Sequence, residues 1–262
     1  MTKRKTGALR RKEQKFTTIN NYEDNRTFYT KESKTVIDFN QAQQRHSSSK
    51  KKVELLPKSL NQEKYILALT DNNLDVVVAS GPAGTGKTYL AMLAAIQALR
   101  DKACDKIVLT RPAVSVDDEK HGFLPGDLNQ KMEPWVKPLY DVLNEFYSVK
   151  ELQYMLAEQI IEIAPLGFCR GRTFKNARII VDEAQNATPS QLKMLLTRIG
   201  EGSKIIIAGD IEQTDRHSPQ NGLLDLTKRL AEHKVPGMTA CTFDSKDIRR
   251  HKIIEHILKM YS

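Results

Sequence analysis

One stretch of the sequence has the residue types and the spacing needed to bind the phosphates of a nucleotide. Residues 81–88 are GPAGTGKT and fit the pattern G-x-x-x-x-G-K-[ST] without a gap. In such a loop the glycines let backbone N–H groups turn toward phosphate oxygens. Lys87 is the expected catalytic lysine at the β and γ phosphates, and Thr88 the expected Mg²⁺ ligand. The expected nucleotide-binding residues of the loop are Gly81, Pro82, Ala83, Gly84, Thr85, Gly86, Lys87 and Thr88.

The sequence on either side of this loop supports the assignment. Residues 76–79 (VVVA) are apolar and mostly β-branched, which predicts a buried strand. Residues 89–100 are rich in Ala, Leu and Met, which predicts a helix whose N-terminus adds a positive dipole end to the site. A Gly-rich turn could match the pattern by chance, but a strand before it and a helix after it make chance a weak explanation.

An acidic pair at the end of another predicted strand is the second candidate for chemistry. Residues 178–181 (RIIV) predict this strand, and Asp182 and Glu183 follow it directly. We expect Asp182 to hold Mg²⁺, mostly through water, and Glu183 to be the catalytic residue that polarises the attacking water. Such a pair is often only a turn, but the phosphate-binding loop makes the functional interpretation the stronger one.

A third predicted strand, over residues 204–208 (KIIIA), leads into a polar segment, residues 209–215. Polar groups at this strand end would face the γ-phosphate and could report its loss. Gln213 is the expected catalytic sensor, and Asp210 would support the geometry of the loop and the metal.

A glutamine upstream of the loop is a candidate for base recognition. Pro57 marks the expected start of the domain, and Ser59 the N-cap of a helix over residues 60–69 that carries Gln62. In several helicase families a glutamine before the phosphate loop recognises adenine through its amide. Gln62 is therefore an ATP-binding candidate, with a surface glutamine as the alternative.

Three arginines are candidates for contact with a nucleic acid. Arg111 follows a predicted strand over residues 106–110, and open α/β sheets bind ligands at the carboxyl ends of their strands. Arg170 and Arg172 belong to a basic turn that could contact phosphates or a neighbouring subunit. A capping or surface role is the alternative for Arg111.

The remaining elements complete an alternating α/β pattern. Two helices are expected within residues 128–160, strands over 159–164 and 238–243, and helices over 188–199, 221–233 and 247–261.

The positive charge of the chain lies at its N-terminal end. The first 58 residues contain 15 Lys and Arg and 6 Asp and Glu, a surplus of nine that accounts for the whole net charge of +9. We expect residues 1–58 to be a basic, largely disordered arm and residues 59–262 to be the folded domain. A nucleic-acid arm and a solubilising tail explain this composition about equally well.

Cysteine usage and hydropathy restrict the class of protein. Cys104, Cys169 and Cys241 are far apart, which favours buried thiols over a zinc site or a disulfide framework. The sequence has no apolar run of membrane-spanning length and a polar N-terminus, so we expect a cytoplasmic protein without membrane contact.

These segments together resemble the PhoH-like family of P-loop ATPases. The resemblance is carried from about Leu60 to the C-terminus by GPAGTGKT, TRPAV, LPGD, RGRTF, IIVDEAQN, LTRIG, AGDIEQTD and DIRRH. The family is similar to the first RecA-like domain of superfamily-one helicases. It implies a single α/β domain of the P-loop NTPase class, with a mostly parallel RecA-like sheet and helices on both faces. It also implies ATP as substrate, Mg²⁺ as cofactor and RNA-directed activity for some members.

Residues 59–262 are enough for one RecA-like domain, whereas helicases of this type complete their site with an arginine from a second domain. We expect a neighbouring subunit to present Arg250, or alternatively Arg249, within a homo-oligomeric ring such as a hexamer. The family usually has an apolar residue where Arg249 stands, which makes Arg250 the better match.

Three functions compete at this point. The first is an ATPase coupled to RNA or single-stranded DNA in a helicase-like way. The second is an assembly or switch ATPase that acts on protein partners. The third, a small-molecule kinase, is disfavoured because Glu183 after the metal-binding Asp182 favours water as the nucleophile.

Overall fold

A computed structural model describes residues 51–112, 137–213, 221–249 and 260 of the chain. The chain divides into two units, Met1–Ser49 and Lys50–Ser262, and all that follows concerns the second.

The unit is built on a sheet of six parallel strands in the order β3-β2-β4-β5-β1-β6. The strands are β1 Val76–Ser80, β2 Lys106–Arg111, β3 Ile161–Pro165, β4 Ala177–Val181, β5 Lys204–Gly209 and β6 Met238–Thr242. Because all the strands run the same way, the segments that follow them meet at one edge of the sheet. The register shows this alignment, since Thr110 pairs with Val181 and Ser80 with Gly209.

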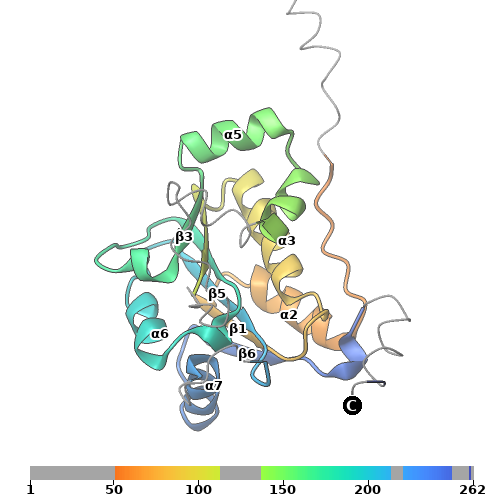
Figure 1. The fold of residues 1–262 in the computed structure, drawn as a ribbon, viewed down its shortest axis with the longest axis vertical. Helices are drawn as coiled ribbons and strands as arrows, with labels where there is room; N and C mark the ends of the chain where they lie inside the picture. Colours follow the sequence, from red (N-terminus) through yellow and green to blue (C-terminus); the bar gives the residue numbers. More distant parts are fainter. Residues whose placement is uncertain (1–50, 113–136, 214–220, 250–259, 261–262) are drawn as a thin grey trace, which may run out of the picture. The chain divides into compact units, whose positions relative to one another are not determined.

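Helices cover both faces of this sheet, with α2 and α3 on one side and α6 and α7 on the other (Figure 1). They are α2 Leu60–Thr70, α3 Lys87–Arg100, α5 Val149–Ala157, α6 Pro189–Leu196 and α7 Gly222–Glu232, with a further helical stretch over residues 137–144. Short 3₁₀ turns occupy Leu166–Cys169, Ala184–Asn186 and Ser245–Asp247. The expected α/β class, parallel sheet and two-sided helix cover are thus confirmed.

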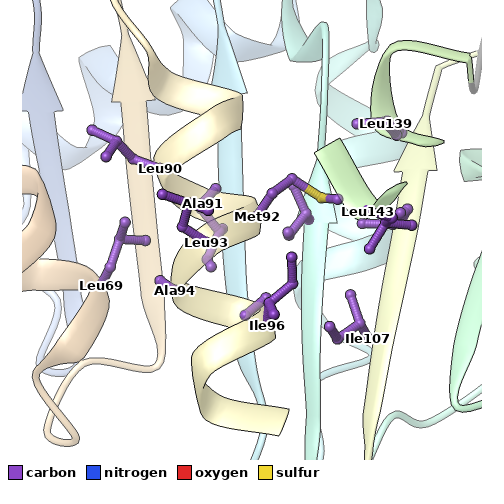
Figure 2. Packing of buried hydrophobic residues seen from close by; sticks show 14 of the residues in the cluster. Leu69, Leu90, Ala91, Met92, Leu93, Ala94, Ile96, Ile107, Leu139 and Leu143 are labelled. Carbon is purple, nitrogen blue, oxygen red and sulfur yellow. The ribbon is translucent and has the colours of Figure 1, made fainter. Parts of the chain in front are cut away.

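Alternation along the strands divides the core into two layers. Val77 of β1 belongs to the layer beneath α2 and α3, whereas Val76 and Val78 belong to the layer beneath α6 and α7. Both faces of these strands are buried, which explains their continuous apolar sequences. Figure 2 shows the first layer, where α3 packs on the sheet through residues such as Met92 and Ile96 near Ile107. This packing fixes the start of α3, and with it the phosphate loop.

Two predicted helices differ from the observed elements. The helix expected over residues 188–199 ends at Leu196, because Ile199 forms a parallel bridge with Phe174 that requires extended backbone. A helix was expected to begin at Asp247, but a 3₁₀ turn capped by Asp244 ends there and Ile248 is extended, and residues 250–259 lie outside the described part of the chain.

Residues 51–58, which we assigned to the arm, lie extended on the folded unit. Val53 and Leu55 pack against the core, and Lys51 forms a 2.7 Å ion pair with Glu145. Arg100 at the end of α3 donates to the Lys51 carbonyl at 2.6 Å. This segment therefore belongs to the unit that begins at Lys50. Residues 1–50 lie outside the described residues, so their expected disorder remains a prediction.

Candidate nucleotide site

The phosphate loop joins β1 to α3, where the sequence placed it. Gly81, Gly84 and Gly86 have φ values of 140°, 82° and 84°, which L side chains rarely adopt. The Lys87 ammonium lies inside the loop, where it donates to the carbonyls of Gly81 at 2.6 Å and Pro82 at 2.7 Å. Only 7% of Lys87 is exposed, so these bonds satisfy a charge that would be costly to bury alone. The backbone of the loop thus surrounds one cation, the ammonium of Lys87.

Thr88 and Asp182 provide the oxygen atoms that a hard cation requires. The Thr88 hydroxyl donates to Oδ1 of Asp182 at 2.6 Å, and the Asp182 amide donates to the Thr110 carbonyl at 2.9 Å. Mg²⁺ is usually bound by one or two such groups together with substrate phosphates and water. Within the described residues no group of three or more His, Cys, Asp or Glu could hold a metal. The pair fits Mg²⁺ brought in with a nucleotide better than a separate resident metal.

Glu183 has an unusual backbone and two side-chain partners. Its φ of 52° places a non-glycine residue in the left-handed region, immediately before the 3₁₀ turn Ala184–Asn186. Its Oε1 lies 3.5 Å from a guanidinium nitrogen of Arg111, and its Oε2 accepts a 2.5 Å hydrogen bond from Gln185. The carboxylate is 38% exposed on the side of the cavity described below.

Gln185 is a site residue to which the sequence analysis gave no role. Its Nε2 donates to Glu183, while its Oε1 accepts from the Asp210 amide at 3.0 Å. A single buried amide therefore joins the ends of β4 and β5. Its position two residues after Glu183 is the sequence feature that could have identified it as a site residue. Gly209 makes the room, because a Cβ there would lie 2.5 Å from the Gln185 oxygen.

A cavity of about 330 Å³ brings most of the predicted site residues together. Its lining includes Lys87, Thr88, Asp182, Glu183 and Gln213. Lys87 and Thr88 come from the start of α3, and the others follow β4 and β5.

The cavity also has apolar lining residues that were not predicted. They are Pro138, Leu139 and Val142 from the helical stretch over residues 137–144, together with Tyr89 of α3. Tyr89 is 41% exposed, so its ring is accessible from the cavity.

Gln62 lies against the phosphate loop and is only 4% exposed. Its Nε2 donates to the Thr85 carbonyl at 2.9 Å, and its Oε1 accepts from the Lys58 amide at 2.7 Å. Ser59 caps α2 as expected, by accepting from the Gln62 amide. Because Gln62 is buried, the alternative that it is a surface glutamine is wrong. Its contact with adenine remains a prediction.

The two arginines of the basic turn have different environments. Arg172 forms a bidentate ion pair with Glu162 of β3 and lies over the Phe174 ring, 4.7 Å from its centroid. These hydrogen bonds hold the pKa of Glu162 below its usual value of 4.5. Arg170 is exposed. The structure thus gives Arg172 a structural partner, whereas both nucleic-acid contacts remain predictions.

Arg249 lies against the phosphate loop of its own chain. The Arg249 amide donates to the Gly84 carbonyl at 3.0 Å, and its guanidinium donates to the Lys58 carbonyl at 2.5 Å. Arg250 lies outside the described residues, so its presentation to a neighbouring subunit remains a prediction.

In the part of the chain that the structure describes, every helix is too short or too polar to cross a bilayer.

Comparison with known proteins shows relatives that share most of this chain. A PhoH-like protein of Synechocystis is 47% identical over 204 residues, which cover 78% of this chain and 61% of the relative. A PhoH-like protein of Bacillus subtilis is 44% identical over 204 residues, which cover 78% of this chain and 63% of that relative. Protein PhoH of Escherichia coli K12 is 39% identical over 211 residues, which cover 79% and 58%. The chain therefore spans about three fifths of the length of these relatives.

Solved structures give weaker matches. The SWI2/SNF2 ATPase core of Sulfolobus solfataricus in complex with dsDNA has a TM-score of 0.43 and 13% identity, over 75% of this chain and 47% of that one. The Pif1 helicase of Candida albicans has a TM-score of 0.41 and 16% identity, over 78% of this chain and 43% of that one. The model of the family described as PhoH-like protein matches residues 54–262. This chain belongs to the PhoH-like family.

Proposed function

We propose that this protein binds ATP with Mg²⁺ and hydrolyses it. The observation that carries the proposal is the 2.6 Å hydrogen bond between Thr88 and Asp182, which brings the phosphate loop and the acidic strand end to one cavity. Two groups that are far apart in sequence thereby form a site for a metal–nucleotide complex.

Each polar group at this site has a role in the proposed reaction. Mg²⁺ bound by Thr88 and Asp182 would neutralise charge on the β and γ phosphates. Lys87, whose ammonium lies inside the loop, exchanges the loop carbonyls for those phosphates when the nucleotide binds. Glu183 orients the attacking water and accepts its proton, and Gln213 senses the γ-phosphate from the end of β5.

We further propose that hydrolysis is coupled to RNA or single-stranded DNA. Residues 1–50 contain 12 Lys and Arg and 5 Asp and Glu, a positive surplus of seven, and such a basic segment attracts a polyanion irrespective of its sequence. Arg111 at the sheet edge and Arg170 on the exposed turn are the candidate contacts.

The ring assembly belongs to the same proposal. Arg249 is engaged with the loop of its own subunit, so Arg250 is the arginine that we propose a neighbouring subunit contributes. An arginine at the γ-phosphate increases the rate by about 10³–10⁵ where it has been measured. Arg250→Ala should therefore reduce ATPase activity per subunit in an assembled ring, and full activity would exclude the idea.

Steady-state ATP hydrolysis with and without single-stranded RNA tests the proposed function. The proposed function would be supported if RNA stimulated ATP hydrolysis and the Glu183→Gln substitution abolished it. The amide of the introduced glutamine cannot accept the proton of water. Activity that Glu183→Gln abolishes but that is indifferent to RNA and DNA would favour the alternative, an assembly or switch ATPase with protein partners. Hydrolysis that persists in Glu183→Gln would exclude the assigned base.

A further inference from the structure

Arg111 and Glu183 meet across the ends of two neighbouring strands. Arg111 is the last residue of β2, and Glu183 follows β4 by two residues. The two strands pair in register up to Thr110 and Val181, which brings the side chains together at 3.5 Å. The sequence placed Arg111 near the ligand but did not connect it with Glu183.

Glu183 thus has a protein partner beside each carboxylate oxygen, an ion pair at one and a hydrogen bond at the other. Arg111 lies beside Oε1, and Gln185 donates to Oε2 at 2.5 Å. A general base has to offer an oxygen to the attacking water. The two partners together fix the orientation of the carboxylate, so a water that requires another orientation can be activated only after the weaker contact opens.

The Arg111 contact is the weaker of the two restraints. Charge-assisted hydrogen bonds are typically about 2.7–2.9 Å long, so a separation of 3.5 Å is long for this pair. The Arg111 side chain is 28% exposed at the edge of the sheet where ligands of open α/β sheets bind. A guanidinium also matches the geometry of a phosphate, to which it can donate two parallel hydrogen bonds.

We propose that Arg111 is a positioning residue whose ion pair holds Glu183 away from the attacking water. When a single-stranded polynucleotide binds, one of its backbone phosphates replaces Glu183 as the partner of Arg111. Binding of the polymer at the end of β2 would draw the guanidinium to the phosphate and release the carboxylate. Polynucleotide binding and hydrolysis are then linked by one ion pair. This inference rests on the proposed ATPase function and names the contact through which the polymer acts.

Steady-state kinetics of Arg111→Ala test the proposal in the full chain. Exposed ion pairs are weak, so we expect kcat without polynucleotide to rise by about 2- to 5-fold, with an unchanged KM for ATP. Addition of a single-stranded RNA should then stimulate the variant much less than the wild type. Arg111→Lys should behave between the two, because lysine keeps the charge but loses the forked geometry. A mononucleotide at equal phosphate concentration should leave the wild type unstimulated.

Arg229→Ala is the matched control. Arg229 also forms an ion pair with a carboxylate, at 2.8 Å from Asp225, but on the exposed face of α7. The same loss of charge there should change neither the basal rate nor the stimulation.

The outcomes separate this inference from the function on which it rests. The role of Arg111 would be overturned if the basal rate of Arg111→Ala were at or below the wild-type rate. It would also be overturned if RNA stimulated Arg111→Ala as strongly as the wild type. Either result would leave the proposed Glu183-dependent ATPase activity intact. Stimulation of the wild type by the mononucleotide would overturn the role of the polymer. The proposed function itself would be overturned if the wild-type protein showed no ATP hydrolysis that the Glu183→Gln substitution removes.

Discussion

The hydroxyl of Thr88 and the carboxylate of Asp182 lie 2.6 Å apart, although 94 positions separate the two residues in the sequence. Thr88 is in the first turn of α3, and Asp182 directly follows β4. The core layer between α3 and the sheet holds both elements, so the fold itself brings the two groups together.

Thr88→Val should abolish the response of nucleotide binding to Mg²⁺. Valine has a similar shape but no hydroxyl, so it removes one of the two oxygen groups that we assign to the metal. We expect hydrolysis to fall by about 100-fold or more, since the metal neutralises charge on the transferred phosphate. Binding of a fluorescent ATP analogue, titrated with Mg²⁺ and with EDTA, measures the effect.

Thr70→Val is the control for this change, because Thr70 is an exposed threonine whose hydroxyl bonds only to carbonyls of its own helix. It should leave binding and its metal dependence unchanged. An unaltered Mg²⁺ response in Thr88→Val would rule out Thr88 as a ligand.

Gln185→Ala should destabilise the domain by about 1–3 kcal/mol. The truncation removes the acceptor of the Asp210 amide, a buried donor that would then be unsatisfied. Urea unfolding followed by circular dichroism measures the loss. Gln153→Ala, on the exposed face of α5, should change stability by no more than about 0.5 kcal/mol. Equal effects of the two substitutions would contradict the bridging role of Gln185.

Gly209→Ala should displace Gln185 and lower both stability and hydrolysis. A Cβ at this position would lie 2.5 Å from the Gln185 oxygen and 2.7 Å from a methyl group of Leu223. Overpacking of this kind costs about 1–3 kcal/mol. Gly167→Ala provides the comparison, because a Cβ there meets nothing within 4 Å. Thermal unfolding should separate the two variants, and a neutral Gly209→Ala would show that Gln185 is not confined there.

The Glu162–Arg172 pair should make stability depend on pH in the acidic range. Because the folded-state pKa of Glu162 lies below its usual value of 4.5, the folded protein binds fewer protons there than the unfolded chain. The stabilisation is therefore complete above pH 4.5 and is lost as the pH falls through the lowered value. We expect Glu162→Gln to cost about 1 kcal/mol at pH 7, since Arg172 is partly exposed to solvent.

Urea unfolding of the wild type and Glu162→Gln at pH 7 and below pH 4 measures this difference. The gap between the two proteins should narrow at the lower pH. A gap of constant size would mean that the pair does not stabilise the fold through the charge of Glu162.

The sequence by itself determined the local machinery of this protein. The phosphate loop is contiguous, so its glycines, Lys87 and Thr88 could be assigned from their spacing alone. The strands β1, β2, β4 and β5 were predictable because burial on both faces requires continuous apolar runs. Asp182 and Glu183 were identified because such a run ends directly before them.

Only the tertiary structure decided which of these groups touch. The contacts of Glu183 with Arg111 and of Gln185 with Asp210 depend on the order β2-β4-β5 in the sheet. The pairing of Arg172 with Glu162 likewise depends on a turn that folds back on β3, which composition could not distinguish from an exposed basic patch. The physical reason is that periodicity reports which faces of an element are buried, whereas side-chain contacts at strand ends follow from strand order and register.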